Sequence, residues 1–209
     1  CRRDLVVCSD EIHGDLILAD RPHVPIAALD REIAARTITL LAPTKTFNLP
    51  GLGCAVAVVP DPELRRRFRA ARRGLVGGIS PLAYAAAEAA WRDGDPWLEA
   101  LLEVLRANHR ALRATVDACD GVRATAVEAT CLAWIDCTAL PVPPERLHAH
   151  FVAHGLGLSP GEQFGGPGFV RFNFGCPPAL LQEGLERFRA AVAAAGSGAA
   201  GPPAQPASP

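Results

Sequence analysis

Short apolar runs alternate with longer amphipathic segments along the first half of the chain. Because these runs are short and rich in β-branched residues, they predict buried strands rather than helices. They span residues 4–8, 37–41 and 54–59. Two helices are expected after them, each opening on a proline, at 62 to about 74 and at 81 to about 91. Strands followed by helices in this way are typical of an α/β layer.

The polar segment 92–96 interrupts this pattern and predicts a domain boundary. Beyond it, apolar residues recur at helical spacing from Trp97 to Val116, which predicts one long amphipathic helix that ends near Cys119. The elements that follow are shorter. Strands are expected at 122–127, 131–136 and 169–174, and helices at 144–154 and 178–194. This mixture indicates a smaller α+β domain.

These patterns divide the chain into three parts. We expect part of a large α/β domain over residues 1–93 and a small α+β domain over 94–195. The low-complexity stretch 196–209, rich in Gly, Ala and Pro, is expected to be a disordered tail. The chain contains no Met, and Cys1 lies at the edge of a predicted strand. We therefore expect the sequence to begin inside a longer protein.

The composition limits the partners and the cellular compartment that are expected for the protein. With 49% hydrophobic residues and a net charge of −1, the chain lacks the basic excess that nucleic acids or membrane surfaces attract. No apolar run comes near the ~20 residues that cross a bilayer. The seven cysteines include no CxxC pair, which favours reduced, buried thiols over disulfides or a zinc site. We therefore expect a cytoplasmic globular protein with no metal, nucleic-acid or membrane partner.

Lysine is almost absent from the chain. Of the 21 Lys and Arg side chains, only Lys45 is a lysine. In a sequence this rich in Ala and Arg, coding bias replaces lysines for which arginine can substitute. A lysine that remains can do what arginine cannot, which is to present a free amine that attacks a carbonyl and forms a Schiff base. The alternative is that one solvent-exposed lysine escaped replacement by chance.

Two residues near the first predicted strand are candidate partners for Lys45. Pyridoxal phosphate is the usual cofactor of Schiff-base lysines, and an ionised carboxylate beside its pyridine nitrogen keeps that nitrogen protonated. Asp10 follows the run 4–8, and open α/β sheets bind ligands at strand ends. His13 could donate a hydrogen bond to the ring oxygen of this cofactor. In isolation, Asp10 would be interpreted as a loop-capping residue and His13 as a loop histidine.

Arg171 lies within the apolar run 169–174. A charged residue at such a position needs a partner, because burial of an unpaired charge costs several kcal/mol. A substrate carboxylate bound in a bidentate manner is one such partner. A structural ion pair with a nearby Asp or Glu is the alternative, and the spacing does not separate the two.

Three other patterns have simpler interpretations. Six arginines between 65 and 73 could form a nucleic-acid-binding helix, but the near-neutral charge and the lack of interleaved aromatics favour a solvated face. His150 and His154 have the i, i+4 spacing of a zinc site, yet no Glu lies between them as in HExxH. The glycines at 74, 77 and 78 are too loosely spaced for a dinucleotide-binding loop.

Several segments together resemble a known family. The two most specific are SDEIHGDL at 9–16 and PTKTFNLPGL at 43–52. Supporting segments lie at 78–81, 86–91, 129–136, 158–161 and 169–173. Over about residues 4–190 they resemble, in order, the C-terminal half of the fold-type I pyridoxal-phosphate enzymes. Among these, the chain is most similar to the PatB/MalY-type cystathionine β-lyases (C–S lyases), which are relatives of the class I/II aminotransferases.

The resemblance implies a fold, a reaction and a role for each matching residue. The chain would form part of the large α/β cofactor-binding domain and the small α+β C-terminal domain. Lys45 would bind pyridoxal 5'-phosphate as a Schiff base and shuttle the substrate α-proton. Asp10 would pair with the pyridinium nitrogen, His13 with the ring hydroxyl, and Arg171 with the substrate α-carboxylate. The implied reaction is α,β-elimination, in which a small sulfur-containing amino acid yields a thiol, pyruvate and ammonia.

The chain departs from the family at two points. The family usually has Ser three residues before the lysine, where its hydroxyl helps to hold the cofactor phosphate. This chain has Ala42 there, and Thr44, directly before Lys45, is the candidate phosphate ligand. The family's chain is also much longer, forms homodimers, and uses its first half for other cofactor contacts. We therefore expect a truncated chain, with a class I/II aminotransferase or an inactive fragment lacking the N-terminal half-site as alternatives.

Overall fold

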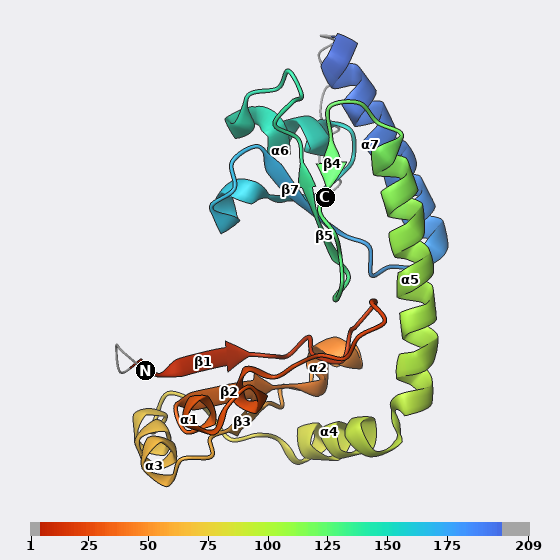
Figure 1. Cartoon of the computed structure of the whole chain (residues 1–209). Helices are drawn as coiled ribbons and strands as arrows, with labels where there is room; N and C mark the ends of the chain where they lie inside the picture. Colours follow the sequence, from red (N-terminus) through yellow and green to blue (C-terminus); the bar gives the residue numbers. More distant parts are fainter. Residues whose placement is uncertain (1–4, 198–209) are drawn as a thin grey trace. The chain divides into compact units, whose positions relative to one another are not determined.

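The computed structural model describes residues 5–197, which form two compact units (Figure 1). The first unit extends to Leu102 and the second begins at Glu103. This division falls inside the long helix α5 (Asp95–Asp117), whereas the sequence pattern places the boundary at 93/94, just before that helix. Each unit has its own sheet and is described separately.

The first unit contains a three-stranded sheet. Its strands, in order across the sheet, are β1 (Val7–Asp10), β2 (Thr37–Leu41) and β3 (Val56–Val58). β1 and β2 are parallel, with Asp10 opposite Leu40, and β3 is antiparallel to β2. The first strand ends two residues later than the run 4–8 predicts, and the third is shorter than the run 54–59. Within the described residues, β1 and β3 each pair on one side only.

Helices connect and follow these strands. They are η1 (Ile26–Ala28), α1 (Arg31–Ala34), α2 (Pro43–Thr46), α3 (Pro62–Ala71) and α4 (Pro81–Asp93). The two helices expected to open on prolines are confirmed, and each has a side-chain cap. Asp61 accepts the N–H of Leu64 at 2.7 Å, and Ser80 accepts the N–H of Ala83 at 3.1 Å. Such caps satisfy N–H groups that the first helical turn leaves without partners.

Burial in the first unit follows the alternation of its strands. Ser9 is buried while Cys8 and Asp10 are exposed, because successive residues of a strand face opposite sides. The expectation that the cysteines are buried is therefore wrong for Cys8. A small apolar cluster packs beside α4 and comprises Cys54, Ala83 and Ala87 with Leu52 and Ile79. Several large apolar side chains stay exposed, namely Leu5, Val56, Val58, Leu75, Val76, Leu82 and Tyr84.

The second unit contains an antiparallel sheet of four strands. Their order is β4 (Arg123–Ala124), β5 (Leu132–Asp136), β7 (Phe169–Asn173) and β6 (Ser159–Pro160). β5 and β7 pair along their whole lengths and match the expected strands to within one residue. β4 is much shorter than the expected 122–127. The sequence did not predict β6, a two-residue edge strand whose proline cannot donate a backbone hydrogen bond.

Helices cover this second sheet and complete its core. They are the remainder of α5, α6 (Pro144–Ala153), η2 (Gly161–Phe164) and α7 (Pro178–Ser197). α5 and α7 lie side by side in this unit (Figure 1), and Arg189 of α7 donates to the hydroxyl of Thr115 on α5 at 2.9 Å. The rings of Phe151 and Phe188 stack at 5.5 Å. These two rings are fully buried, as are Phe174, Leu112 and Ile135.

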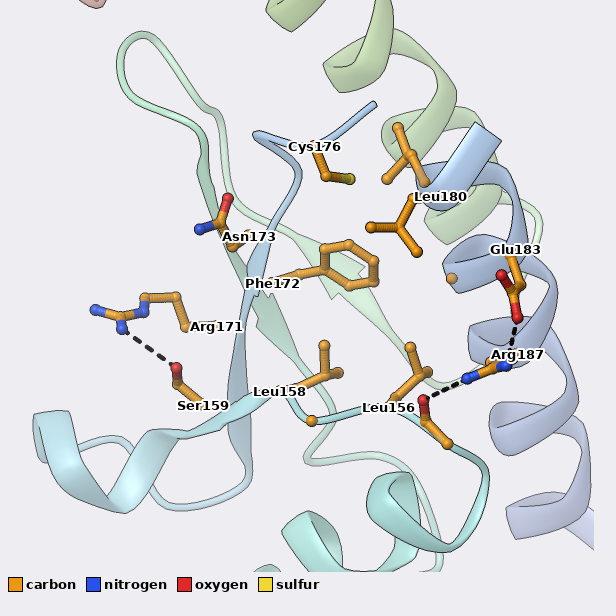
Figure 2. A pocket seen from close by; sticks show the side chains of 14 residues that line it. Leu156, Leu158, Ser159, Arg171, Phe172, Asn173, Cys176, Leu180, Glu183 and Arg187 are labelled. Carbon is orange, nitrogen blue, oxygen red and sulfur yellow. Dashed lines mark hydrogen bonds and ion pairs between the residues drawn. The ribbon is translucent and has the colours of Figure 1, made fainter. Parts of the chain in front are cut away.

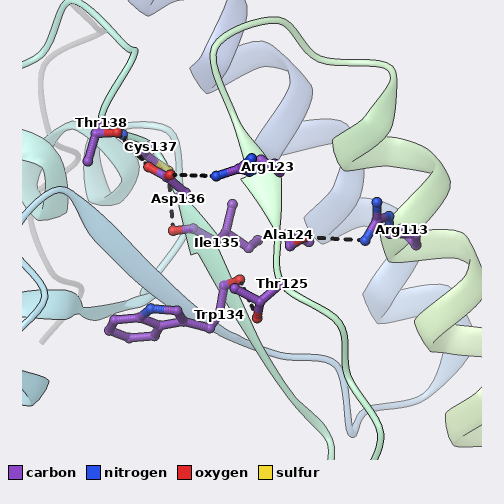
Figure 3. A network of polar contacts seen from close by, with 9 residues as sticks. All are labelled: Arg113, Arg123, Ala124, Thr125, Trp134, Ile135, Asp136, Cys137 and Thr138. Atoms are coloured by element: carbon purple, nitrogen blue, oxygen red, sulfur yellow. Dashed lines mark hydrogen bonds and ion pairs between the residues drawn. The ribbon is translucent and has the colours of Figure 1, made fainter. Parts of the chain in front are cut away.

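Polar contacts fix the β4 edge of the sheet (Figure 3). Arg113 of α5 donates to the carbonyl of Ala124 at 3.2 Å and forms an ion pair with Asp117 at 2.8 Å. Asp136 accepts the hydroxyl of Thr138 at 2.6 Å and its backbone N–H at 2.9 Å. These two hydrogen bonds hold the pKa of the Asp136 carboxyl below its ordinary value.

The last helix extends further than the sequence pattern indicates. α7 runs to Ser197, so that Gly196 and Ser197 belong to its last turn rather than to the expected tail. The rest of that predicted tail, 198–209, lies outside the described residues, as does residue 4 of the first predicted strand. Among the helices that are described, none is both long enough and apolar enough to cross a membrane.

Replacement of Asn108 tests how the second unit is held together. Asn108 is 3% exposed, and its Nδ2 donates to the carbonyls of Phe174 and Cys176, both at 2.9 Å. Asn108→Ala leaves both acceptors without this donor, so we expect the free energy of unfolding to fall by about 2 kcal/mol in urea titrations. Glu103→Ala, at an exposed site on the same helix, should change it by less than about 0.5 kcal/mol. Equal losses in the two variants would contradict this assignment.

Candidate functional site

The candidate residues of the first unit lie where its two parallel strands end. Since β1 and β2 run in the same direction, their carboxyl ends share one edge of the sheet. Asp10 is the last residue of β1. β2 leads through Ala42 into α2, which carries Lys45 (Figure 1). His13 lies in the turn that follows β1, so residues far apart in the sequence reach the same edge.

His13 links the other two residues electrostatically. Burial lowers the pKa of His13, the charge of Lys45 lowers it further, and the carboxylate of Asp10 partly opposes the shift. The imidazole is therefore within the influence of both charges. Its Nδ1 atom is buried and has no hydrogen-bond partner among residues 5–197. An unpaired buried polar atom of this kind is costly unless a ligand or water satisfies it.

Asp10 remains available to a ligand. Its side chain is exposed, and its Oδ1 accepts a long hydrogen bond from the N–H of Ile12 at 3.4 Å. Asp10 also lines a cavity of about 550 Å³, together with Ala42 and Thr44. A volume of this size accommodates a ring-sized molecule. Of Asp10, His13 and Lys45, only Asp10 lines this cavity.

Lys45 occupies a short and well-anchored element. α2 contains four residues, of which Pro43 and Thr46 are buried, whereas Lys45 itself is exposed. The exposed amine is accessible to a carbonyl compound. A helix of one turn has almost no stability of its own, so contacts with other parts of the unit must fix where Lys45 lies.

A buried glutamate holds the loop after β1, and the sequence reasoning missed it. The Glu11 carboxylate accepts the hydroxyl of Ser9 at 2.8 Å, the N–H of Ile26 at 3.2 Å, and pairs with His23 Nε2 at 2.8 Å. Burial raises the pKa of Glu11, but these hydrogen bonds and the charge of His23 outweigh it and place the pKa below its ordinary value. The period of two along β1 could have revealed the residue, because Glu11 continues the buried face of Ser9.

Arg171 lies in the second unit, on β7, between two neighbouring strands. Trp134 of β5 and Ser159 of β6 stand directly opposite it in the sheet. Its guanidinium donates to the hydroxyl of Ser159 at 3.2 Å and lies over the ring of Phe164, 4.5 Å from the ring centroid. Among residues 5–197 it forms no ion pair with a carboxylate, so the structural ion pair that the sequence left open is not found. The charge is held by a hydroxyl and a ring, and its remaining donors can bind an anion.

A second cavity, of about 260 Å³, lies beside Arg171 (Figure 2). Figure 2 shows Arg171 and Ser159 on the side of the sheet away from Leu180, and Phe172 pointing toward Leu180. This follows from the alternation of side chains along β7. The hollow itself is therefore mainly apolar, with Leu156, Leu158 and Leu181 completing its wall. The sequence pattern did not predict it.

The histidine motif lies at the end of α6, and most of the arginine motif lies in α3. His150 Nε2 lies 2.8 Å from the carbonyl of Ala191, and His154 Nδ1 lies 2.9 Å from the carbonyl of His150. Within the described part of the chain, no group of His, Cys, Asp and Glu could hold a metal ion. The arginine-rich helix α3 has no buried residue, and Arg66 forms an exposed ion pair with Glu63 at 2.6 Å.

Comparison with known proteins identifies the family. A family model described as aminotransferase class I and II matches residues 1–188. The chain belongs to that family. This membership agrees with the resemblance carried by the segments at 9–16 and 43–52, and with the mixed α/β architecture of the two units.

The proteins that resemble this chain include one named as a lyase and one whose structure contains pyridoxal 5'-phosphate. Cystathionine beta-lyase PatB of Bacillus subtilis (strain 168) is 36% identical over 193 residues, which cover 90% of this chain and 50% of PatB. The solved structure of OvoB is 49% identical, with a TM-score of 0.88 over 91% of this chain and 50% of that one. Cystalysin from Treponema denticola, whose structure contains pyridoxal 5'-phosphate, is 31% identical, with a TM-score of 0.87 over 92% of this chain and 50% of that one. This chain thus spans about half the length of the relatives it matches.

Ala42, at the position where the resemblance implies a serine, is the N-cap residue of α2. Its backbone is extended, and its methyl group makes no capping hydrogen bond to the helix. A serine at an N-cap would accept an N–H group of the first turn. Thr44, which is half-buried and lines the cavity beside Asp10, is the nearby residue that offers a hydroxyl. The departure from the family pattern therefore leaves one hydroxyl at the start of this helix.

Replacement of His13 should change how stability depends on pH. The pKa of His13 is lower in the folded chain than its ordinary value of 6.5. Between these two pKa values the unfolded chain binds more protons, so acidification destabilises the folded chain over that interval. In urea titrations between about pH 7.5 and about pH 5.5, His13→Gln should therefore lose less stability than the wild type does. The same loss in both proteins would show that His13 is not a buried titrating group.

Proposed function

We propose that this chain provides the lysine-bearing part of a pyridoxal-phosphate-dependent carbon–sulfur β-lyase. The observation that carries the proposal is the grouping of Asp10, His13 and Lys45 at one edge of the parallel β1–β2 pair. The family assignment and the name of PatB support the choice of reaction. The proposed substrate is a small amino acid with a sulfur substituent on Cβ.

Features of the first unit fit pyridoxal phosphate. The open carboxylate of Asp10 suits the pyridine nitrogen, and the cavity that it lines suits a ring. The unpaired Nδ1 of His13 suits the oxygen on that ring, because a hydrogen bond there would satisfy a buried polar atom. The hydroxyl of Thr44 is the proposed phosphate ligand from α2. These residues are therefore chemically suited to hold the cofactor.

Lys45 performs the proton transfer in the proposed reaction. When bound, pyridoxal phosphate withdraws electrons from the Cα–H bond of the substrate. Lys45 would hold the cofactor through its aldehyde carbon, and its Nζ would accept the α-proton of the substrate. Asp10 keeps the pyridine nitrogen protonated throughout. His13, whose lowered pKa favours the neutral ring, would donate a hydrogen bond from Nδ1 to the ring oxygen of the cofactor.

Arg171 binds the substrate α-carboxylate in this proposal. A guanidinium presents paired donors that match a carboxylate, and this one is already held by Ser159 and Phe164. Less side-chain freedom is then lost when substrate binds. The absence of a carboxylate partner within residues 5–197 supports this role.

The proposed reaction breaks the Cβ–S bond of the substrate. The α-proton leaves Cα, and the electron pair of the C–H bond expels the thiolate from Cβ. Hydrolysis of the remaining three-carbon fragment consumes one water and releases pyruvate and ammonium, while the thiolate takes up a proton to become a thiol. The reaction is balanced without an oxidant or reductant, and no acceptor keto acid is needed.

We also propose that the active assembly is a homodimer in the cytoplasm. The segment 75–84 exposes four large apolar side chains, Leu75, Val76, Leu82 and Tyr84, and a protein–protein contact would cover them. No disulfide joins the described cysteines, which agrees with a reducing compartment. The alternatives are an aminotransferase and an inactive fragment. Class I/II aminotransferases use the same residues, and a chain that spans half of its relatives could be inactive alone.

Covalent binding of the cofactor tests the role of Lys45. Pyridoxal phosphate added to the purified chain should produce the absorption band of a lysine-bound cofactor, and Lys45→Ala should abolish it. Lys45→Arg is the matched control, because it keeps the positive charge but cannot form a C=N bond with the aldehyde. A band of wild-type intensity in Lys45→Arg would show that the cofactor reacts elsewhere.

The products distinguish a lyase from an aminotransferase. With an S-substituted cysteine and no keto acid, the lyase proposal predicts pyruvate and thiol in equal amounts, measured by coupled enzymatic and thiol assays. Turnover that requires an added keto acid would favour the aminotransferase. Binding of the cofactor without turnover would favour the inactive fragment.

Arg171→Lys should lower kcat/KM by about tenfold to a hundredfold, since lysine lacks the bidentate geometry.

A further inference from the structure

The position of Lys45 depends on the residues on either side of α2. A single helical turn cannot hold its own place, because it gains too few hydrogen bonds to offset the ordering of its backbone. Thr46, directly after Lys45, is 0% exposed, and Phe47 follows it. The contacts of these two residues therefore fix the direction in which the amine of Lys45 can point.

Thr46 is bonded to the loop that carries His13. Its Oγ1 donates to Oδ2 of Asp15 at 2.9 Å, across 31 positions of sequence. Hydrogen bonds to a carboxylate are roughly twice as strong as those between neutral groups. The hydrogen bond thus connects α2 directly to the turn that follows β1.

The loop on the Asp15 side is itself rigidly built. The N–H of Gly14 donates to the carbonyl of Glu11 at 2.9 Å, and that of Leu16 donates to the carbonyl of His13 at 3.0 Å. Glu11 is in turn held by Ser9 and His23. Asp15 therefore stands in a pair of tight turns that also determine where His13 lies.

The other side of α2 rests on an aromatic contact. The rings of Phe47 and Trp97 lie 5.9 Å apart, and Phe47 also packs against Gly94, where a Cβ atom would collide with its ring. Phe47 thus anchors α2 to the start of α5, and Thr46 anchors it to the His13 loop. Lys45 comes immediately before these two anchors.

We propose that Asp15 and Thr46 are a positioning pair that sets the location of the Lys45 amine relative to Asp10 and His13. This inference rests on the proposed function, and neither residue touches the reacting atoms. The physical reason is that the hydrogen bond joins helix α2, which carries Lys45, to the turn that carries His13 and directly follows Asp10 at the end of β1. Without it, α2 keeps the Phe47 contact but loses its bond to the His13 loop.

The experiment compares variants that keep or remove the hydroxyl of Thr46. Thr46→Val removes the donor with little change of shape, Thr46→Ser keeps it, and Asp15→Asn removes the charge of the acceptor. Thr37→Val is the matched control, because Thr37 is also 0% exposed and donates to the carbonyl of Ile33 at 2.7 Å, at the far end of β2. Each full-length chain is titrated with pyridoxal phosphate, and the Kd and pH midpoint of the lysine-bound band are recorded with the Tm of the cofactor-free chain.

A positioning role has a distinct pattern of results. We expect Thr46→Val and Asp15→Asn to raise the Kd by about tenfold, the factor that corresponds to one lost hydrogen bond, and to shift the pH midpoint. Thr46→Ser should stay within about twofold of the wild type, and Thr37→Val should lower the Tm without changing the Kd. The double variant, Thr46→Val with Asp15→Asn, should have the same Kd as Thr46→Val alone, because both changes remove the same hydrogen bond.

Two kinds of failure are separable. If the wild type shows a Lys45-dependent band and Thr46→Val keeps its Kd and pH midpoint, the positioning role is wrong while the proposed function stands. The same conclusion follows if Thr37→Val raises the Kd as much as Thr46→Val does. If the wild type captures no aldehyde at Lys45, the proposed function is wrong and this inference falls with it. Reductive trapping and peptide mapping decide that last point, since the chain contains a single lysine.

Discussion

Parallel pairing of β1 with β2 is the constraint on which the candidate site depends. It sends both strands out of the sheet at the same edge, so the residue that ends β1 and the helix that follows β2 become neighbours. An antiparallel pair would place Asp10 and Lys45 at opposite ends. Parallel strands need a crossover connection, and here residues 11–36 make it, which explains why Glu11, His13 and Asp15 all lie in one tightly bonded segment.

The sequence predicted the parts of this arrangement that depend on local pattern. Strand β2 followed from a β-branched run, α3 and α4 from their prolines, and Lys45 from the chemistry that arginine cannot perform. It did not predict α1 or α2, because a single turn is shorter than one period of an amphipathic helix. It also missed the partners of Glu11 and Thr46, which come from distant parts of the chain and obey no spacing rule. The candidate site residues could thus be chosen by residue type, whereas the residues that hold them in place could not.

In the second unit, the structure gives Arg171 an environment that its spacing in the sequence could not indicate. A charged residue in an apolar strand had two candidate partners, and the sheet gives Arg171 a different environment, between Trp134 and Ser159 with Phe164 beneath it. Trp134 contacts Phe164 at 5.9 Å between ring centroids and stacks on Phe169 at 5.4 Å, so the ring beneath the guanidinium belongs to a small aromatic cluster. A cation held in this way is partly desolvated yet still has free donors. That combination is suited to recognition of an anion rather than to stabilisation of the fold.

The three-stranded sheet has a consequence for work with this stretch of chain. Within the described residues, β1 and β3 have unpaired N–H and C=O groups along their outer sides, and Val56 and Val58 on β3 are exposed. Exposed edge strands with apolar side chains can pair with strands of other molecules, and such pairing is the first step toward aggregation. The shortness of β3 limits this templating, while no lysine is present on either strand to discourage it. Protein concentration is therefore a variable to control whenever this polypeptide is handled on its own.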